Sequence, residues 1–248
     1  MVRAKHKKFK SASLSKAMID KFEFLNLLAT SFNKFLFDNF NSSENLNTAI
    51  VGTGLVSPAL FDLDLRTGYL ANSIAKAYYA IPWFNPVYAV LYIRAYLGSM
   101  ADCKAFFGFK QSPAGIDWAD PVQIKESSSG LMIDGGKLYA YTSRKTADGP
   151  PATYSQQKTE ITGIDATRDF IYKIEFNKFS TQPLPQVIPY FDGFRIITPD
   201  RIWTLNQTNG TYPPEDIIHN LYFEIKNNTG ADKFLKIKAL TYGEEYAD

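Results

Sequence analysis

Few residues of this chain have the type and spacing that catalysis requires. Asp62 and Asp64 alternate in a predicted strand, so their carboxyl groups fall on one face. Two carboxyl groups on one strand face can cleave a glycosidic bond as acid and nucleophile. The expected pattern is Glu-x-Asp-x-(x)-Glu, and no glutamate completes it here. We therefore interpret Asp62 and Asp64 as part of a solvated strand edge.

Nucleophilic and metal chemistry also lack the necessary residues. His6 and His219 are the two histidines, and Cys103 is the single cysteine, so no disulfide can form within the chain. His219 has no nucleophile-elbow motif to join in a Ser-His-Asp triad, and with Cys103 it does not complete a zinc site. Residues 52–54 (GTG) are typical of a β-turn rather than a dinucleotide loop. The sequence predicts no enzyme, no metal and no cofactor.

A basic arm at the start is the clearest electrostatic feature. The chain has 27 Lys and Arg against 25 Asp and Glu, and six of the basic residues precede the first acidic one, Asp20. The predicted contact residues are Arg3, Lys5, Lys7, Lys8 and Lys10. Such a cluster can neutralise nucleic-acid phosphates, approach an anionic bilayer or remain a solvated tail. We favour nucleic acid or another acidic partner.

No signal peptide and no transmembrane segment are expected. Charged residues at positions 20, 21 and 23 interrupt the apolar stretch that follows the basic start. The most apolar run, residues 78–97, contains two prolines and Arg94 and alternates in its second half, which favours buried strand. Asn227 begins one of the N-x-S/T sequons, which arise readily by chance in an Asn-rich chain.

A helix is predicted over residues 13–40, because apolar residues recur there at intervals of four and three. The residues expected to contact a neighbour are Met18, Phe22, Leu25, Phe32 and Leu36. Other apolar side chains cover adjoining faces, so the helix must be buried on more than one side. It packs either along its own sandwich or against copies of itself or another subunit. A polar linker follows, dividing the chain into residues 1–45 and 46–248.

Short alternating strands and tight turns fill the second part. The predicted strands are residues 48–51, 59–65, 88–97, 106–109, 131–133, 138–141, 170–176, 221–226 and 234–242. Residues 134–136 (DGG) predict a tight hairpin, because the turn needs positive φ. Residues 146–158 and 181–214 are expected to be long loops, and Glu175 and Glu224 to face outward. The predicted class is mainly β, a two-sheet antiparallel sandwich.

Alternation also predicts the core face of individual strands. In residues 88–97 the buried set is expected to be Ala89, Leu91, Ile93, Ala95 and Leu97.

Several strand and turn motifs together resemble a known fold. They are residues 70–75 (LANSIA), 92–96 (YIRAY), 105–109 (AFFGF), 130–133 (GLMI), 136–139 (GKLY), 172–176 (YKIEF), 190–193 (YFDG) and 235–237 (LKI). Their order is similar to that in concanavalin A-like (laminin-G-type) jelly rolls, most of all those of tailed-phage and other viral structural proteins. The resemblance covers about residues 46–248 and implies a jelly-roll sandwich.

Two functions are compatible with this reading. The resemblance, together with the arm and helix, favours a non-enzymatic virion structural protein: a capsid, turret, fibre or tail component. It would form a homo-oligomer with other virion proteins as partners, and the virion is its expected location. The alternative is a glycan-binding or host-attachment module, with Trp118, Trp203 and Asn206 as candidate contacts to a host glycan.

Overall fold

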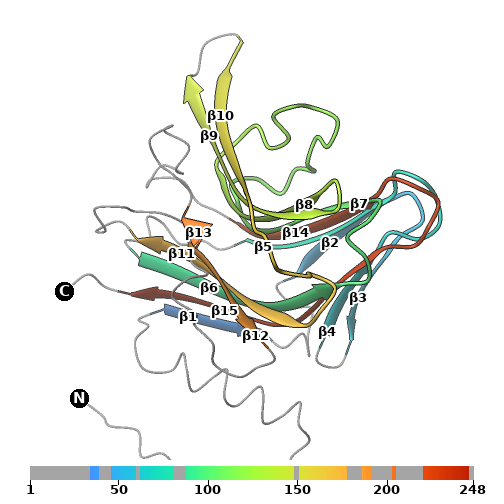
Figure 1. The fold of residues 1–248 in the computed structure, drawn as a ribbon, viewed down its shortest axis with the longest axis horizontal. Helices are drawn as coiled ribbons and strands as arrows, with labels where there is room; N and C mark the ends of the chain where they lie inside the picture. Colours follow the sequence, from blue (N-terminus) through green and yellow to red (C-terminus); the bar gives the residue numbers. More distant parts are fainter. Residues whose placement is uncertain are drawn as a thin grey trace, which may run out of the picture. The chain divides into compact units, whose positions relative to one another are not determined.

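The computed structural model describes residues 34–38, 46–59, 62–80, 88–147, 151–177, 186–191, 203–204 and 220–245. Contacts divide the chain into two units, residues 1–31 and 32–248, and every described residue belongs to the second. That unit contains two antiparallel sheets that face each other (Figure 1). The predicted class, a mainly β sandwich, is confirmed. None of the described residues forms a helix long and apolar enough to cross a membrane.

One sheet has eight strands. Its main path is β13 (Trp203–Thr204), β12 (Gln186–Phe191), β11 (Phe170–Asn177), β6 (Tyr88–Leu97), β15 (Phe234–Glu245), β4 (Asp62–Arg66) and β3 (Leu55–Ala59). The eighth strand, β1 (Lys34–Asp38), pairs with β15 from Leu240 to Glu244, beyond the point where β4 ends its pairing at Ile237. Two short strands therefore share one edge of β15.

Strand β1 corrects part of the helix prediction. Leu36 was assigned to a helix over residues 13–40, but it lies in β1 opposite Tyr242. The prediction was wrong for Lys34–Asp38 because β15 offers backbone partners along its edge, and an apolar triplet between charged ends fits a strand as well as a helix. The rest of the predicted helix, with Met18, Phe22, Leu25 and Phe32, lies outside the described residues.

The other sheet has seven strands. Their order is β10 (Thr153–Glu160), β9 (Lys137–Ala147), β8 (Ser128–Asp134), β7 (Cys103–Lys110), β14 (Asn220–Asn227), β5 (Ile74–Ala80) and β2 (Asn47–Val51). The predicted turn between β8 and β9 is confirmed, with φ of +57° at Gly135 and +75° at Gly136. The predicted loop 146–158 was wrong, since β9 and β10 pair across most of it. Strands β12 and β13 likewise interrupt the loop expected at 181–214.

The main core lies between the two sheets. Alternate residues of neighbouring strands fill it, among them Leu63 and Leu65 of β4, and Phe107 and Phe223 of the central strands β7 and β14. The core face predicted for residues 88–97 is confirmed where side chains are described. Its members Ile93, Ala95 and Leu97 are buried. Each large apolar side chain buried in this way contributes about 1.5–3 kcal/mol.

The seven-stranded sheet is also covered on its other side, which we call the outer face. Phe106 and Met132 point to that face and pack in a second apolar cluster separate from the main core. Gly108 and Gly130 lie opposite each other at its centre. A Cβ on Gly108 would come within 2.5 Å of the Gly130 Cα, so neither strand has room for a side chain here. The candidate site is built on this outer face.

Candidate functional site

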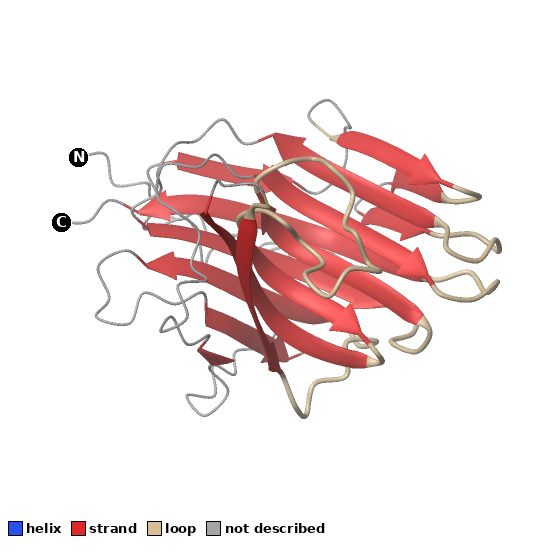
Figure 2. Cartoon of the chain, turned by 90° about the horizontal axis from the view of Figure 1, so that it is seen from above, coloured by secondary structure: helices blue, strands red, loops and turns tan. Residues whose placement is uncertain are grey.

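Residues 111–127 join β7 to β8 and fold over the outer face of the seven-stranded sheet (Figure 2). We call them the covering loop. The ends of the loop meet, because the Gln111 amide donates a 2.9 Å hydrogen bond to the Ser127 carbonyl. Asp120 shapes its middle by accepting a 2.8 Å bond from the Val122 amide, a turn that aspartate favours. A compact loop with joined ends is an Ω-loop, a type that often carries function.

Apolar side chains hold the covering loop against the sheet. Three of them, Ile116, Trp118 and Ile124, are buried among aromatic and methionine side chains of the outer face. The residues they meet there are Phe106, Met132, Tyr141 and Tyr222. The rings of Phe106 and Tyr141 meet edge to face at 6.2 Å, a preferred arrangement of aromatic pairs. The loop is therefore a packed part of the fold.

Glu224 of β14 lies beneath this loop with no exposed surface. The Trp118 indole donates to its carboxylate at 2.6 Å, and the Ile116 amide donates at 3.3 Å. The Tyr222 hydroxyl donates to it as well. Burial raises the pKa of Glu224, and these hydrogen bonds oppose the rise. Glu224 lies on the outward face that alternation predicts, but it is buried, because alternation does not show that a loop covers that face.

Lys110 is the buried cation of the site, and its side chain is 1% exposed. Its ammonium donates to the carbonyls of Ser112 (2.8 Å) and Ala114 (2.7 Å) and to the Glu126 carboxylate. These bonds use all three of its donors. It also lies 4.9 Å from the centre of the Tyr222 ring. Burial lowers the pKa of Lys110, while Glu126 acts against that change. Lys110 thus fixes the first turn of the covering loop to its last.

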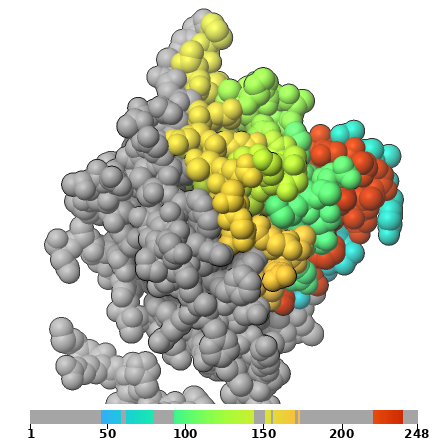
Figure 3. All heavy atoms as spheres, in the orientation of Figure 1, coloured from blue at the N-terminus to red at the C-terminus, as the bar shows by residue number. Residues whose placement is uncertain are grey.

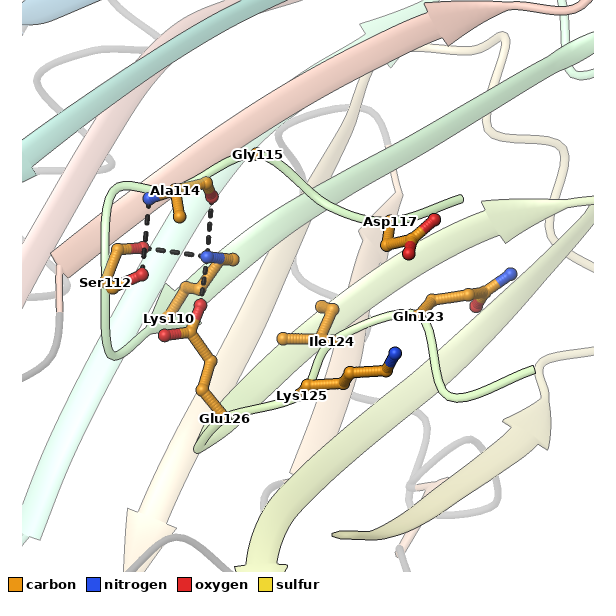
Figure 4. Close-up of a pocket in the computed structure, with 9 residues that line it drawn as sticks. All are labelled: Lys110, Ser112, Ala114, Gly115, Asp117, Gln123, Ile124, Lys125 and Glu126. Carbon is orange, nitrogen blue, oxygen red and sulfur yellow. Dashed lines mark hydrogen bonds and ion pairs between the residues drawn. The ribbon is translucent and has the colours of Figure 1, made fainter. Parts of the chain in front are cut away.

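A pocket of about 270 Å³ lies along the covering loop (Figure 4). Its polar lining consists of Lys110, Ser112, Asp117, Gln123, Lys125 and Glu126. Figure 4 shows the Lys110 ammonium among Ser112, Ala114 and Glu126. Asp117 and Lys125 are exposed and can meet a ligand directly. The lining combines carboxylates, an amide, a hydroxyl and an ammonium, which suits a small ligand rich in hydroxyl groups.

A second ionic group supports the loop from the hairpin side. Asp134 accepts hydrogen bonds from Lys158 at 2.6 Å and from Gln123 at 3.1 Å. Lys104 lies 3.5 Å away and donates to the Trp118 carbonyl. Burial alone would raise the pKa of Asp134, but the bonds from Lys158 and Gln123 and the nearby positive charges outweigh it and lower that pKa. Gln123 thereby joins the pocket to the β8–β9 hairpin.

The structure places the predicted glycan contacts apart. Trp118 is 4% exposed and packs on the underside of the covering loop, so its ring is not available for stacking on a sugar in this arrangement. Trp203 lies in β13, in the eight-stranded sheet, and its side chain lies outside the described part. Asn206 lies outside the described residues altogether.

The other predicted residues do not enter the site. The arm contacts, Arg3, Lys5, Lys7, Lys8 and Lys10, lie outside the described residues, as do His6 and His219. Asp62 and Asp64 lie on β4 of the other sheet. Asp64 binds Arg66 at 3.0 Å, and Asp62 lies 3.7 Å from the Lys236 ammonium. Cys103 is buried, which raises the pKa of its thiol to about 11. Within the described ranges, no three His, Cys, Asp or Glu side chains gather as metal ligands.

The sequence reasoning missed Lys110, Glu126 and Gln123. A signal was present: residues 111–127 contain two prolines, a glycine and several polar residues, yet also the large apolar residues of a packed loop. Lys110 also continues the alternation of β7 on the same face as Phe106. What the sequence did not show is that this face is covered.

No family model and no curated protein match this chain. Solved structures do resemble it. The carbohydrate recognition domain of Emp47p has a TM-score of 0.55 at 10% identity, covering 88% of this chain and 99% of that one. An endo-acting O-glycanase of the human gut microbiota, described in mucin breakdown, has a TM-score of 0.54 at 13% identity, covering 85% of this chain and 99% of that one. The laminarinase catalytic domain from Thermotoga maritima MSB8 has a TM-score of 0.52 at 12% identity, covering 88% of this chain and 100% of that one.

These similarities correct one expectation. The sequence predicted a protein without enzymatic activity, because the Glu-x-Asp-x-(x)-Glu run is missing. Catalytic domains share this fold, so its architecture accommodates glycan-active sites as well as binding sites. At identities of 10–13% the likeness shows the fold alone. The chain is a concanavalin A-like jelly-roll sandwich, the fold of carbohydrate recognition domains and glycanases.

Proposed function

We propose that this chain binds glycans through the pocket of the covering loop. The observation that carries the proposal is a pocket with convergent polar side chains on the outer face of a fold used by carbohydrate recognition domains. The function that the sequence analysis favoured, a virion structural protein, has less support than its glycan-binding alternative. None of the three structures compared above is described as viral.

The size and chemistry of the pocket support a small polar ligand. Its volume of about 270 Å³ is close to the lower end of ligand pockets, roughly 300–1,000 Å³. Lys110 already spends its donors inside the protein, so it shapes the pocket instead of meeting the ligand. Asp117 and Lys125 are exposed at the lining and offer an acceptor and a donor. One terminal sugar residue, or a short part of a longer glycan, fits this description.

A glycan array with the intact protein, followed by calorimetry on the strongest ligand, tests the proposal. Lys125→Ala removes a lining ammonium whose side chain is 45% exposed, so the fold should survive. We expect its affinity to fall about tenfold. Lys137→Ala is the matched control: Lys125 pairs with Asp120 and Lys137 with Glu160, both lysines are exposed, and Lys137 lies outside the pocket.

Two results would count against the proposal: no binding of the native protein to any glycan, or equal affinities of Lys125→Ala and Lys137→Ala. Mass spectrometry of the bound glycans after incubation separates binding from cleavage. Intact glycans indicate a binding module, whereas shortened glycans indicate a glycan-active enzyme, which uses this pocket if Lys125→Ala also slows the cleavage.

A further inference from the structure

The exposed large apolar side chains of the described part of the chain gather at one corner of the sandwich. They are Ile50, Val51, Leu55, Tyr69 and Leu70. Ile50 and Val51 end β2, Leu55 begins β3, and the other two lie in the turn between β4 and β5. Val51 is 58% exposed and Tyr69 is 78% exposed. An apolar patch of this kind on a protein surface marks an interaction site more often than chance.

The turns that carry this corner are held together. The Leu70 amide donates to the Thr53 hydroxyl at 3.1 Å, and the Thr53 amide donates to the Ser73 hydroxyl at 3.2 Å. The β4–β5 turn is tied in turn to the segment before β15, because the Thr67 amide donates to the Lys233 carbonyl at 2.9 Å. In Figure 3 the cyan atoms of residues 62–80 meet the red atoms of the C-terminal strands at the same margin. The corner is therefore ordered in advance of any partner.

Strand β2 lies at the end of the seven-stranded sheet and pairs with β5 on one side. Its other side has no partner among the described strands. Proteins usually protect such edges with charged residues or proline. The opposite end strand, β10, carries Lys158 and Glu160, and β3, which ends the other sheet at this corner, contains Pro58. The sequence of β2, NTAIV, contains neither a charged residue nor a proline.

We propose that β2 is the contact between two copies of this chain, paired antiparallel about a twofold axis. Centred on Ala49, the pairing sets Thr48 opposite Ile50 and Asn47 opposite Val51. No charge opposes another in this register, because β2 is uncharged, so the strand is complementary to itself. The same residues serve both copies, as a twofold interface requires. The seven-stranded sheets then join into one, and Ile50 and Val51, on opposite faces of the strand, each lose part of their exposure to water.

The two central residues give this register a direct test. A residue on the axis faces its own copy, with Cα atoms about 4.5–5.5 Å apart, within the range a disulfide spans. Ala49→Cys should therefore form a cross-linked dimer under mild oxidation. Thr48→Cys is the matched control, since it would face Ile50 and not itself. The native Cys103 is buried and does not compete.

Sedimentation of the full chain over a dilution series measures the association itself. We expect twice the chain mass of 28.0 kDa, falling to 28.0 kDa on dilution. Val51→Lys should give a monomer, because each lysine loses apolar contact and brings a charge to the interface. The control Ala119→Lys adds the same charge at an exposed position of the covering loop and should remain dimeric. Circular dichroism should show both variants folded.

Three results would overturn the proposal. The first is a native chain that is monomeric at every concentration. The second is a dimer that Val51→Lys leaves intact but Phe22→Glu abolishes, which would assign the contact to the N-terminal segment. The third is equal cross-linking at positions 49 and 48, which would rule out the twofold register centred on Ala49.

Discussion

The indole nitrogen of Trp118 donates a 2.6 Å hydrogen bond to the carboxylate of Glu224, although 106 positions separate the two residues in the sequence. This bond joins the covering loop to the central strand β14. Because Glu224 has no exposed surface, its charge has been removed from water and is stabilised by the hydrogen-bond donors around it and by the charge of Lys76. The covering loop, which borders the candidate pocket, is thus hydrogen-bonded to a carboxyl group whose charge depends on pH.

The charge of Glu224 should make stability depend on pH. Burial raises its pKa in the folded state, so its favourable contribution is complete below the unfolded value of about 4.3 and is lost as the pH rises through the folded value. Glu224→Gln, which stays neutral, should therefore raise Tm at pH 7 and make little difference at pH 4. Each kcal/mol gained corresponds to about 2–4 °C. Thermal unfolding of the native protein and of Glu224→Gln between pH 4 and pH 7 measures this difference in Tm.

Glu160→Gln is the control for that experiment, because Glu160 is an exposed acid of the same sheet. Its effect should be small at both pH values. If Glu224→Gln instead lowers Tm equally at pH 4 and pH 7, the hydrogen bonds of Glu224, and not its charge, dominate its contribution.

The Lys110–Glu126 pair should be energetically coupled. Lys110 is 1% exposed, so the interaction is less screened than one at the surface. In a double-mutant cycle with Lys110→Met and Glu126→Gln, we expect a coupling of about 1–3 kcal/mol in urea unfolding. The cycle of Lys137 with Glu160, whose side chains are 54% and 39% exposed, provides the comparison. There we expect a clearly smaller coupling, because solvent screens the exposed pair. Equal couplings would show that burial adds nothing to the pair.

Asn227 should be important for stability. It is fully buried, its amide nitrogen donates to the Gly68 carbonyl at 3.0 Å, and its amide oxygen accepts from the Ser73 amide at 3.1 Å. Asn227→Ala removes both hydrogen bonds, at about 0.5–1.5 kcal/mol for each, while the Ser73 amide keeps its 3.2 Å bond to the Leu70 carbonyl. The neighbouring exposed Asn228→Ala should change stability by less than about 0.5 kcal/mol. Chemical denaturation measures the free energy of unfolding of both variants. Similar losses of stability in the two would contradict the importance of the Asn227 side chain.

The same burial bears on the sequon that Asn227 begins. A fully buried amide cannot carry a glycan without opening the β4–β5 turn. Expressed in a secretory system, the folded chain should therefore lack a glycan at Asn227. Intact-mass spectrometry with and without glycosidase checks this, and a modified Asn227 in folded protein would contradict the structure.

The close approach of β7 and β8 predicts a different response at two glycines. A Cβ on Gly108 would meet the Ser129 carbonyl oxygen at 2.4 Å, whereas one on Gly115 meets only the Glu224 carboxylate at 3.8 Å. Gly108→Ala should therefore cost about 1–3 kcal/mol through overpacking. Gly115→Ala should lie within about 0.5 kcal/mol of the native protein. A neutral Gly108→Ala would show that the strands can separate at this point.

Local patterns in the sequence determined the sandwich. Alternation identified Ile93, Ala95 and Leu97 as core, and residues 134–136 identified the β8–β9 turn, because side-chain period and positive φ are local properties. Local patterns led to a wrong prediction where the same apolar spacing fits both a strand and a helix. Leu36 fits a heptad, but the edge of β15 decides that it is a strand residue.

The candidate site depended on contacts that only the tertiary structure shows. Alternation places Glu224 and Lys110 on the outer face of their sheet, where an acid and a lysine are normally solvated. Both become buried because residues 111–127 fold back over that face, and each forms its own hydrogen bonds to this loop. Which loop covers which sheet depends on apolar contacts between distant segments, such as Trp118 with Tyr222. The sequence by itself therefore determined the strands and their faces, and the tertiary structure decided which face became a site.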